Sequence, residues 1–427
     1  MQKIRLGIFV EGTFLPSFEG ATQRFVSLAE NLSNSNFDII ILHCFRGWSN
    51  KDIIKEQHYT TYFIPPDTFY NDISIIEKII TLEKIEVVIM SNFEMIMQIG
   101  YPLKRKLDSI KLIFEVHDIS YDYNKSLNPK REANEIEKRF EYLAFRISDL
   151  CICFNDYDKK RVIEILNEYN SENINDKIIV IPFGITHNKT GFVGVNLHSK
   201  NIIFLGNMYH TPNLIALKDI FYKILPIIKR YDSSIKFLIV GDTPRSLIDE
   251  CHDKQMIFLG KIINLNPVFK DSILAISPIF YGSGIKVKVL EYCQAGIPTL
   301  CSSQSLRGII RSEADKLDFE IEENIENYGD RILNLINQKE RLLEMSRSTK
   351  IYCSRHSWTN IIKSYNSVIK NCSTKSNITI SKEDKLLLIQ LNPYFLEYYH
   401  RLKRFENIKI EKIYKGGFGS FSELNLI

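Results

Sequence analysis

The sequence lacks the features that mark a secreted, membrane-spanning or nucleic-acid-binding protein. Its eight cysteines are scattered, mostly within apolar runs, and they predict buried free thiols in a reducing compartment rather than a disulfide framework. No apolar run reaches the roughly 18 residues that a spanning helix needs, and the first residues do not resemble a signal peptide. The formal net charge of +4 is too small to favour nucleic acid as a partner. We therefore expect a cytoplasmic protein that binds no nucleic acid.

Metal-ligand patterns are also missing. Cys151 and Cys153 are one residue apart in a strand-like run, and no second pair of cysteines or histidines follows at the spacing of a zinc site. The sequence therefore predicts no metal centre.

The order of the apolar segments predicts an α/β fold. The chain has 427 residues, 44% of them hydrophobic and 25% charged, which is enough for two or three ordinary domains. Short apolar strands alternate with helical stretches, the first at 22–32, and this alternation is typical of parallel sheets covered on both faces. The strands are expected at 4–10, 39–44, 59–64, 87–90, 112–116, 150–154, 178–181, 202–205, 235–240, 256–259, 273–276 and 299–301.

A pause in this alternation predicts the domain boundary. The pattern stops at Pro182, Phe183 and Gly184 and the polar stretch 186–199, and it then restarts. We predict a first domain over 1–190, a second over 191–372, and a linker with a C-terminal extension over 373–427. Ligands in such sheets bind beyond the carboxyl ends of the strands. A cleft between two facing units would suit a donor on one side and an acceptor on the other.

The stretch with the clearest chemistry runs from 277 to 296 and reads S-P-I-F-Y-G-S-G-I-K-V-K-V-L-E-Y-C-Q-A-G. Pro278 stops the expected strand, Gly282 and Gly284 open a flexible turn, and a helix is expected over 286–293. Strand, glycine turn and helix form an anion-binding arrangement, because the first helical N–H groups have no internal partner and the helix dipole is positive there. Lys286 and Lys288 add full positive charges.

Helix geometry decides which of these side chains can act together. Lys288 and Glu291 are three residues apart and share one helical face, whereas Lys286 joins them only if it still lies in the turn. A diphosphate would then lie over the turn, and Glu291 would accept hydrogen bonds from sugar hydroxyls one turn deeper. The alternative is a surface helix after a glycine turn with its lysines in solvent.

Other loops at the expected strand ends carry weaker signals. A second glycine turn at Gly20 opens a helix with Arg24 in its first turns, and His117 with Asp118 follows a strand. A histidine beside an aspartate is more often a structural hydrogen bond or strand cap than a catalytic pair. Gly206 and Asn207 follow the first strand of the second unit, and an ordinary turn there is as good an account as a ligand contact.

These motifs together resemble those of retaining nucleotide-sugar glycosyltransferases of the GT-B fold, in the group called glycosyltransferase family 4. The resemblance rests on F-L-G-N-M-Y-H-T-P-N, L-I-V-G-D-T-P and G-S-G-I-K-V-K-V-L-E-Y-C-Q-A-G-I-P in the second unit, and it covers residues 1 to about 370. It implies two Rossmann-like, doubly wound domains that face a cleft, with a C-terminal extension. It also implies that a segment near 355–372 crosses back to the first domain.

The resemblance assigns roles residue by residue. Glu291 would hold the ribose of the donor, and the backbone at Gly284 and Ile285 would approach its diphosphate. Gly20 would face donor and acceptor, and His117 would lie near the transferred sugar. The full set of donor-binding candidates is Gly20, Arg24, Gly206, Asn207, Gly282, Ser283, Gly284, Ile285 and Glu291, and the catalytic candidates are His117, Lys286 and Lys288.

Two departures from the family pattern matter. The position eight before Glu291 is Ser283, where most members carry a second glutamate, and the loop after the first strand of the second unit lacks the usual arginine and lysine. We infer that Lys286 and Lys288 replace those cations on the leaving diphosphate. Because the protein then supplies its own cations, we expect no cofactor and no essential metal.

Three function classes remain open on this evidence. The first is transfer of a sugar from a nucleotide-diphosphate-sugar donor to a glycan or lipid-linked acceptor in cell-surface polysaccharide or glycoconjugate synthesis. The second is an epimerase or hydrolase of the same fold, and the third is a non-catalytic partner subunit. The apolar, aromatic and basic stretch 385–405, interrupted by Pro393, either lies on the inner face of a membrane as a peripheral contact or completes the core of the protein.

Overall fold

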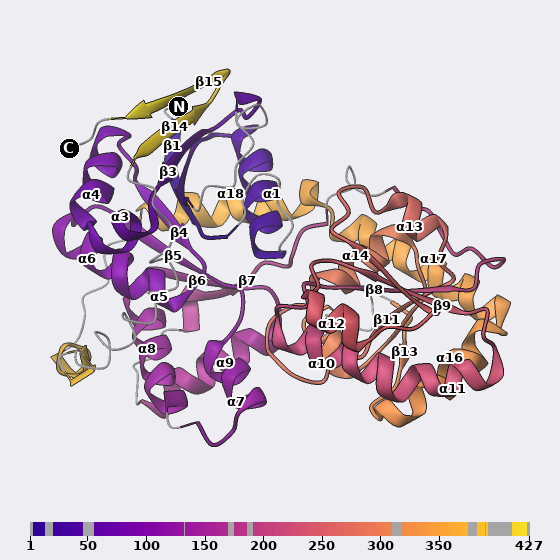
Figure 1. Ribbon diagram of the computed structural model, residues 1–427. Coiled ribbons are helices and arrows are strands. Elements are labelled where there is room, and N and C mark those ends of the chain that lie inside the picture. Colours follow the sequence, from indigo (N-terminus) through magenta and orange to yellow (C-terminus); the bar gives the residue numbers. More distant parts are fainter. Residues whose placement is uncertain are drawn as a thin grey trace. The chain divides into compact units, whose positions relative to one another are not determined.

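The computed structural model describes residues 3–12, 20–45, 55–131, 133–169, 175–185, 191–309, 317–374, 382–388, 390–391 and 412–424. The chain forms two compact units (Figure 1). Unit 1 comprises Met1–Phe183 and Trp358–Ile427, and unit 2 comprises Gly184–Ser357. The chain thus passes from unit 1 to unit 2 a few residues before position 190, and it returns at Trp358.

Unit 1 is built on a sheet in the order β15-β14-β3-β2-β1-β4-β5-β6-β7. Its seven N-terminal strands are parallel, and each overlaps a strand predicted from the apolar pattern. Their bounds are Ile4–Val10 (β1), Phe37–Cys44 (β2), Thr60–Ile64 (β3), Val87–Met90 (β4), Lys111–Val116 (β5), Leu150–Cys153 (β6) and Ile178–Val180 (β7). The prediction of a parallel α/β unit is confirmed.

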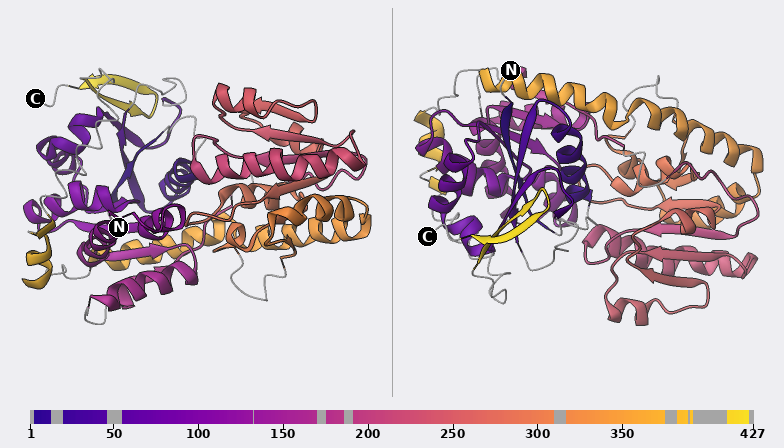
Figure 2. Two further views of the ribbon diagram at one scale, coloured as in Figure 1. Left: turned by 60° about the horizontal axis from the view of Figure 1, so that its bottom comes forward. Right: turned by 90° about the horizontal axis from the view of Figure 1, so that it is seen from above.

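Helices cover both faces of this sheet (Figure 2). Neighbouring residues of one strand point to opposite faces, so Val88 of β4 belongs to one apolar core and Val87 to the other. The helices are Gly20–Ser33 (α1), Pro66–Asn71 (α3), Ile73–Leu82 (α4), Phe93–Met95 (α5), Ile96–Gly100 (η1), Tyr101–Lys106 (α6), Ser120–Leu127 (α7), Ala133–Ile147 (α8), Asp156–Glu168 (α9), Asn175–Lys177 (η2) and Trp358–Thr374 (α18).

The C-terminal part of the chain adds to unit 1. Helix α18 packs against α1 and contributes Trp358 and Tyr365 to the core. A hairpin of β14 (Ile413–Gly417) and β15 (Ser420–Leu424), which the apolar pattern does not predict, pairs antiparallel with β3. Of the stretch 385–405, residues 389 and 392–405 lie outside the described residues, whereas Leu391 is buried in the core of unit 1. The described part therefore fits the alternative in which this stretch completes the core, and membrane contact stays a prediction.

Unit 2 is built on a parallel sheet in the order β10-β9-β8-β11-β12-β13. The strand bounds are Asn201–Leu205 (β8), Lys236–Val240 (β9), Met256–Gly260 (β10), Leu274–Ser277 (β11), Thr299–Cys301 (β12) and Glu320–Ile321 (β13). The helices are Thr211–Asp219 (α10), Ile220–Ile224 (η3), Leu225–Tyr231 (α11), Arg245–Glu250 (α12), Asn266–Lys270 (α13), Val287–Ala295 (α14), Ser303–Leu306 (α15), Ile325–Asn327 (η5), Tyr328–Ile336 (α16) and Lys339–Arg355 (α17). The predicted strands are confirmed here as well, except that the two-residue β13 was not foreseen.

The strand order of unit 2 reverses between β8 and β11. From β8 the chain continues to β9 on one side, and from β11 it continues to β12 on the other. The loops that leave two such strands diverge, which opens a crevice beyond their carboxyl ends, and ligands of α/β sheets bind at this switch point. The two loops of interest are those after β8 and β11.

The structure also bears on the predictions of buried free cysteines and of a chain without a membrane-spanning helix. All eight cysteines are free and buried, as their scattered positions predict. Within the described residues, no helix combines the length and the hydropathy that crossing a membrane requires.

Candidate functional site

The glycine turn after β11 has the backbone conformation that its sequence predicts. Gly282 and Gly284 adopt φ angles of 95° and 67°, in the left-handed region that favours glycine. The carbonyl oxygen of Gly282 accepts a hydrogen bond from Gln304 Nε2 at 2.5 Å, and Ser283 is buried between the two glycines. Helix α14 begins only at Val287, so Lys286 lies in the turn.

Because Lys286 lies in the turn, its charge lies at the same end of α14 as the glycine backbone. Its ammonium donates hydrogen bonds to the carbonyl oxygens of Ser283 at 2.8 Å and Gly284 at 3.1 Å. The positive charge is therefore held at the glycine turn, beside the N-terminus of α14. Full charge and helix dipole have the same sign at this point, which favours an anion.

Lys288 lies where the loops after β8 and β11 meet. Its Nζ donates a hydrogen bond to Asn213 Oδ1 at 2.6 Å and lies 4.4 Å from the centre of the Phe204 ring. Gly206 leaves room for this ammonium, because a Cβ at that position would be 3.0 Å from Lys288 Nζ and 2.9 Å from Asn213 Cγ. Asn213 Nδ2 in turn donates to the carbonyl oxygen of Asn207 at 2.9 Å.

The electrostatics of this group are those of an anion site. Burial and the charge of Lys286 lower the pKa of Lys288 to about 7, and Glu291 opposes this shift only in part. Among the described residues, no carboxylate forms an ion pair with Lys288. The pKa of His210, at the start of α10, is lowered to about 4 by burial of its ring and then by Lys288 and Lys286, although the residue as a whole is exposed. An anion bound here would relieve this crowding of positive charge.

Helix α14 is fixed against the sheet by its aromatic side chain. The hydroxyl of the buried Tyr292 accepts a hydrogen bond from the Leu205 N–H at 2.8 Å, at the carboxyl end of β8. Gly296 ends the helix with a φ of 77°. Glu291 is half-buried on the helical face of Lys288, as the three-residue spacing predicts, and Ile285 is half-buried in the turn. The structure thus brings Gly206, Asn207, Gly282, Ser283, Gly284, Ile285, Lys286, Lys288 and Glu291 together in unit 2.

The remaining candidates lie in unit 1. Gly20 begins α1, and residues 13–19 of its loop lie outside the described residues. Arg24 is fully buried and does not face solvent. Its guanidinium lies 4.7 to 5.2 Å from the centres of four aromatic rings. It donates hydrogen bonds from Nε and Nη2 to Glu115. The four rings are those of Phe154, Phe183, Trp358 and Tyr365. In this structure Arg24 is a core residue.

His117 follows β5 and is oriented by Glu115 rather than by Asp118. Its Nε2 lies 2.8 Å from Glu115 Oε2, and its ring stacks on Phe25 with centres 5.0 Å apart. Asp118, next to His117 in sequence, is exposed. Burial alone would raise the pKa of Glu115, but the charge of Arg24 and the hydrogen bonds of His117 and Tyr365 lower it to about 2.

Sequence reasoning missed three members of these groups. His210 directly precedes α10 and Asn213 lies in the first turn of that helix, next to the predicted loop at Gly206 and Asn207. Neither residue is assigned a role from the sequence, and the signal is their place near the switch point. Glu115 lies inside a predicted strand, two residues before His117, where side chains share a face.

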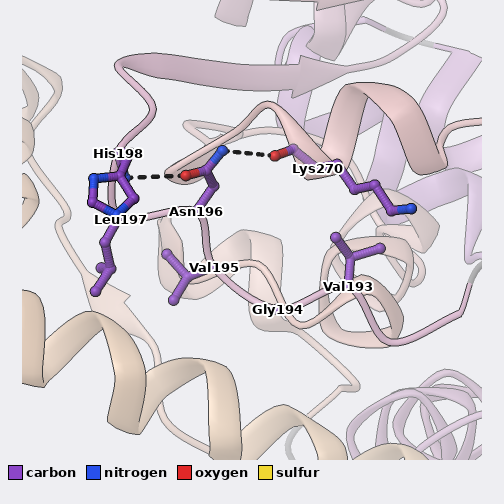
Figure 3. Close-up of a pocket in the computed structure, with 7 residues that line it drawn as sticks. All are labelled: Val193, Gly194, Val195, Asn196, Leu197, His198 and Lys270. Carbon is purple, nitrogen blue, oxygen red and sulfur yellow. Dashed lines mark hydrogen bonds between the residues drawn. The ribbon is translucent and has the colours of Figure 1, made fainter.

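A hollow in the described part of unit 2 lies away from these two loops. It has a volume of about 380 Å³ and is lined by Val193, Gly194, Val195, Asn196, Leu197, His198 and Lys270 (Figure 3). The Val193 and Gly194 N–H groups donate to the Ala295 carbonyl, at the opposite end of α14 from the glycine turn. Asn196, its most central polar side chain, is already hydrogen-bonded to Lys270 O and His198 N. We do not place the donor there.

No group of three or more histidine, cysteine, aspartate or glutamate side chains that could hold a metal ion occurs in the described ranges. Metal independence stays a prediction.

Comparison with known proteins finds a family match within unit 2. The model of the family described as glycosyl transferases group 1 matches residues 199–338, which contain both loops of the site. A curated Klebsiella pneumoniae protein, named as an uncharacterized 44.6 kDa protein in the cps region, is 26% identical over 199 residues, 43% of this chain. The match spans 50% of the length of that protein.

Two solved structures share the fold across both units. Sucrose-phosphate synthase from Thermosynechococcus elongatus superposes with a TM-score of 0.68 at 12% identity, covering 86% of this chain and 99% of the other. Anabaena Alr3699/HepE, in complex with UDP and glucose, gives a TM-score of 0.66 at 9% identity and covers 87% and 100%. The fold is the GT-B fold of these proteins, and the match to the glycosyl transferases group 1 model lies within unit 2.

Proposed function

We propose that the protein is a glycosyltransferase that moves a sugar from a nucleotide-diphosphate-sugar donor to a glycan or lipid-linked acceptor, with retention at the transferred carbon. The observation that carries this proposal is the position of Lys288: its ammonium lies at the switch point, at the start of α14, with Lys286 beside it and with a glycine at 206 that leaves it room. Unit 2 binds the donor in this proposal.

The chemistry follows from the charges that develop during transfer. Breaking the bond between sugar and phosphate builds positive charge on the sugar ring and negative charge on the leaving diphosphate. Fixed cations and N–H groups at the diphosphate lower this barrier, and no covalent nucleophile is needed for it. Lys286, Lys288 and the turn at Gly284 supply such groups, and Glu291 accepts hydrogen bonds from the ribose.

The relatives suggest which substrates to try first. The complex of the Anabaena protein with UDP and glucose makes UDP-glucose a reasonable first donor. The place of the Klebsiella protein in the cps region supports the idea of a surface polysaccharide or glycoconjugate as the product. Both substrate assignments remain proposals for this chain.

The experiment has two stages. A thermal-shift screen of nucleotide sugars identifies the donor, because a ligand that binds only the folded state raises its melting temperature. Release of nucleoside diphosphate is then measured with and without candidate glycan and glycolipid acceptors. Release that depends on an acceptor supports transfer, and release without an acceptor favours a hydrolase. No release with any donor favours a non-catalytic partner subunit, a reading that Ser283 at the place of the usual glutamate keeps open.

A further inference from the structure

The strand β5 ends in a hydrogen-bonded pair that the proposed reaction does not by itself explain. Glu115 and His117 are two residues apart on one face, and Glu115 is fully buried. Its two carboxylate oxygens have different partners. Oε1 accepts hydrogen bonds from Arg24 Nε at 3.3 Å and Nη2 at 3.2 Å and from the Tyr365 hydroxyl, whereas Oε2 faces His117 Nε2 at 2.8 Å.

The charge state of Glu115 decides which atom donates to the other. The same environment that lowers the pKa of Glu115 to about 2 keeps its carboxylate ionised at any ordinary pH. An ionised carboxylate can only accept hydrogen bonds. The hydrogen of the 2.8 Å contact must therefore be on His117 Nε2.

The ring of His117 is also held in its plane, and its other nitrogen is available. Phe25 stacks on it at 5.0 Å with 26° between the planes, and Phe154 lies against it at 5.3 Å. No hydrogen bond from the described part of the chain reaches Nδ1, and the side chain keeps 15% of its surface exposed.

We propose that Glu115 is a positioning residue that holds neutral His117 with its proton on Nε2, so that Nδ1 offers a lone pair to a hydroxyl group of the bound sugar substrate. The group recognised at Nδ1 is thus a hydrogen-bond donor and not a phosphate or carbonyl oxygen. The role toward sugar rests on the proposed function, whereas the tautomer does not. Arg24 and Tyr365 act through Glu115, and Tyr365 is supplied by α18, 250 residues further along the chain.

The test is a measurement of the histidine tautomer in the full-length protein without substrate. The protein is labelled with ¹⁵N at its histidine rings, and nitrogen-detected or long-range ¹H–¹⁵N spectra are recorded at about pH 8.5, above the usual pKa of histidine of about 6.5. The signals of His117 are identified by their loss in His117→Gln. We expect a protonated, pyrrole-type signal for Nε2 and an unprotonated, pyridine-type signal for Nδ1. A proton on Nδ1, in either the other neutral tautomer or the imidazolium, would overturn the proposal.

Replacing the carboxylate by an amide sharpens this test. In Glu115→Gln, Arg24 and Tyr365 still require an acceptor, so the amide oxygen should face them and the NH₂ group should face His117. His117 Nε2 must then accept, and the proton should move to Nδ1. Tyr365→Phe is the matched control, because it removes a hydrogen bond from Oε1 and leaves the Oε2 contact intact; its His117 spectrum should match that of the wild type.

The outcomes separate a positioning role from a structural one. A merely structural Glu115 would lower the melting temperature in both variants without moving the proton, and an unchanged tautomer in folded Glu115→Gln would overturn the proposal. If Glu115→Gln does not fold, the wild-type spectrum still decides. Failure of every nucleotide sugar to react would remove the proposed function and leave the tautomer assignment in place. Transfer activity with a proton on Nδ1 would remove only this inference.

Discussion

At the scale of single residues, Lys288 is the side chain on which the proposed anion site depends. Burial and the charge of Lys286 lower its pKa to about 7. In the described part of the protein its hydrogen-bond partner is the neutral Asn213, and Glu291 on the same helical face opposes the lowered pKa only in part. These surroundings favour the proposed binding of an anion.

Removal of this ammonium should therefore affect activity much more than stability. We expect Lys288→Ala to lower kcat/KM for the donor by about 100-fold to 1,000-fold, the usual effect of losing one group that stabilises charge in a transition state. The free energy of unfolding should change by less than about 1 kcal/mol. Steady-state kinetics and chemical denaturation measure the two effects, with the exposed Lys254→Ala as the control. Equal losses of activity and stability would show that Lys288 is a structural residue.

The lowered pKa also predicts how donor binding responds to pH. An adjacent diphosphate favours the charged form of Lys288 and raises its pKa, so at about pH 8 the complex binds more protons than the free protein does. Affinity for UDP should then fall as pH rises above about 7. Isothermal titration calorimetry at pH 8 in buffers of different ionisation enthalpy should reveal proton uptake. His210, with a pKa of about 4 in the free protein, starts too low to titrate in this range, and Lys288→Ala should lose the uptake.

The site residues that could be predicted are those whose neighbours in the site are also their neighbours in the sequence. The glycine turn, Lys288 and Glu291 follow one another within ten residues, so turn chemistry and helical spacing suffice. The hydrogen-bond partner of His117 is Glu115, two residues before it, and not the adjacent Asp118. Neighbouring residues at the end of a strand point to opposite faces, whereas residues two apart share a face. The burial of Arg24 could not be predicted, because the hydroxyl that it donates to belongs to Tyr365, 341 residues away.

At the scale of elements, strands with continuous apolar runs were predictable and the C-terminal hairpin was not. The prediction for residues 4–10 agrees with β1 at both ends, because all of its side chains enter a core or lie near one. The strand β15 reads S-F-S-E-L and is largely exposed. Its place in the sheet depends on β14, which pairs with the edge of β3, and on aromatic contacts of Phe421 with Phe63 and Tyr414. No local pattern reveals these partners.

The turn of this hairpin provides a matched pair of substitutions. Gly417 and Gly419 both have left-handed φ angles, of 118° and 79°. A Cβ at Gly417 would lie 2.1 Å from the carbonyl oxygen of Tyr59, whereas a Cβ at Gly419 would meet nothing within 4 Å. We expect Gly419→Ala to cost about 1 kcal/mol for backbone strain alone, and Gly417→Ala to cost at least about 2 kcal/mol more by pushing the hairpin from β3. Chemical denaturation measures both, and equal costs would mean that the hairpin does not pack on Tyr59.

At the scale of the whole molecule, sequence pattern could show that there are two α/β units but not how the chain is shared between them. Composition changes near residue 190 because the connection there is polar, whereas unit 2 begins at Gly184. The return passage carries no such change in composition, and only the family resemblance implies a crossing near 355–372. Residues 358–374 read as one more amphipathic helix after α17, and their assignment to unit 1 depends on the pocket that Trp358 and Tyr365 fill beside Arg24.

This division predicts unequal effects of shortening the chain. A protein that ends at Ser357 keeps every residue of unit 2 but loses α18, which contributes Trp358, Tyr365 and Ile369 to the core of unit 1. Without Tyr365, the buried Arg24 and Glu115 also lose a shared hydrogen-bond partner. Burying three large side chains contributes about 1.5 to 3 kcal/mol each, and this sum is comparable with the whole stability of a domain. We expect hydrogen exchange to show unit 1 unprotected and unit 2 protected. Retained protection of β1 and β5 in the shortened protein would show that unit 1 folds without α18.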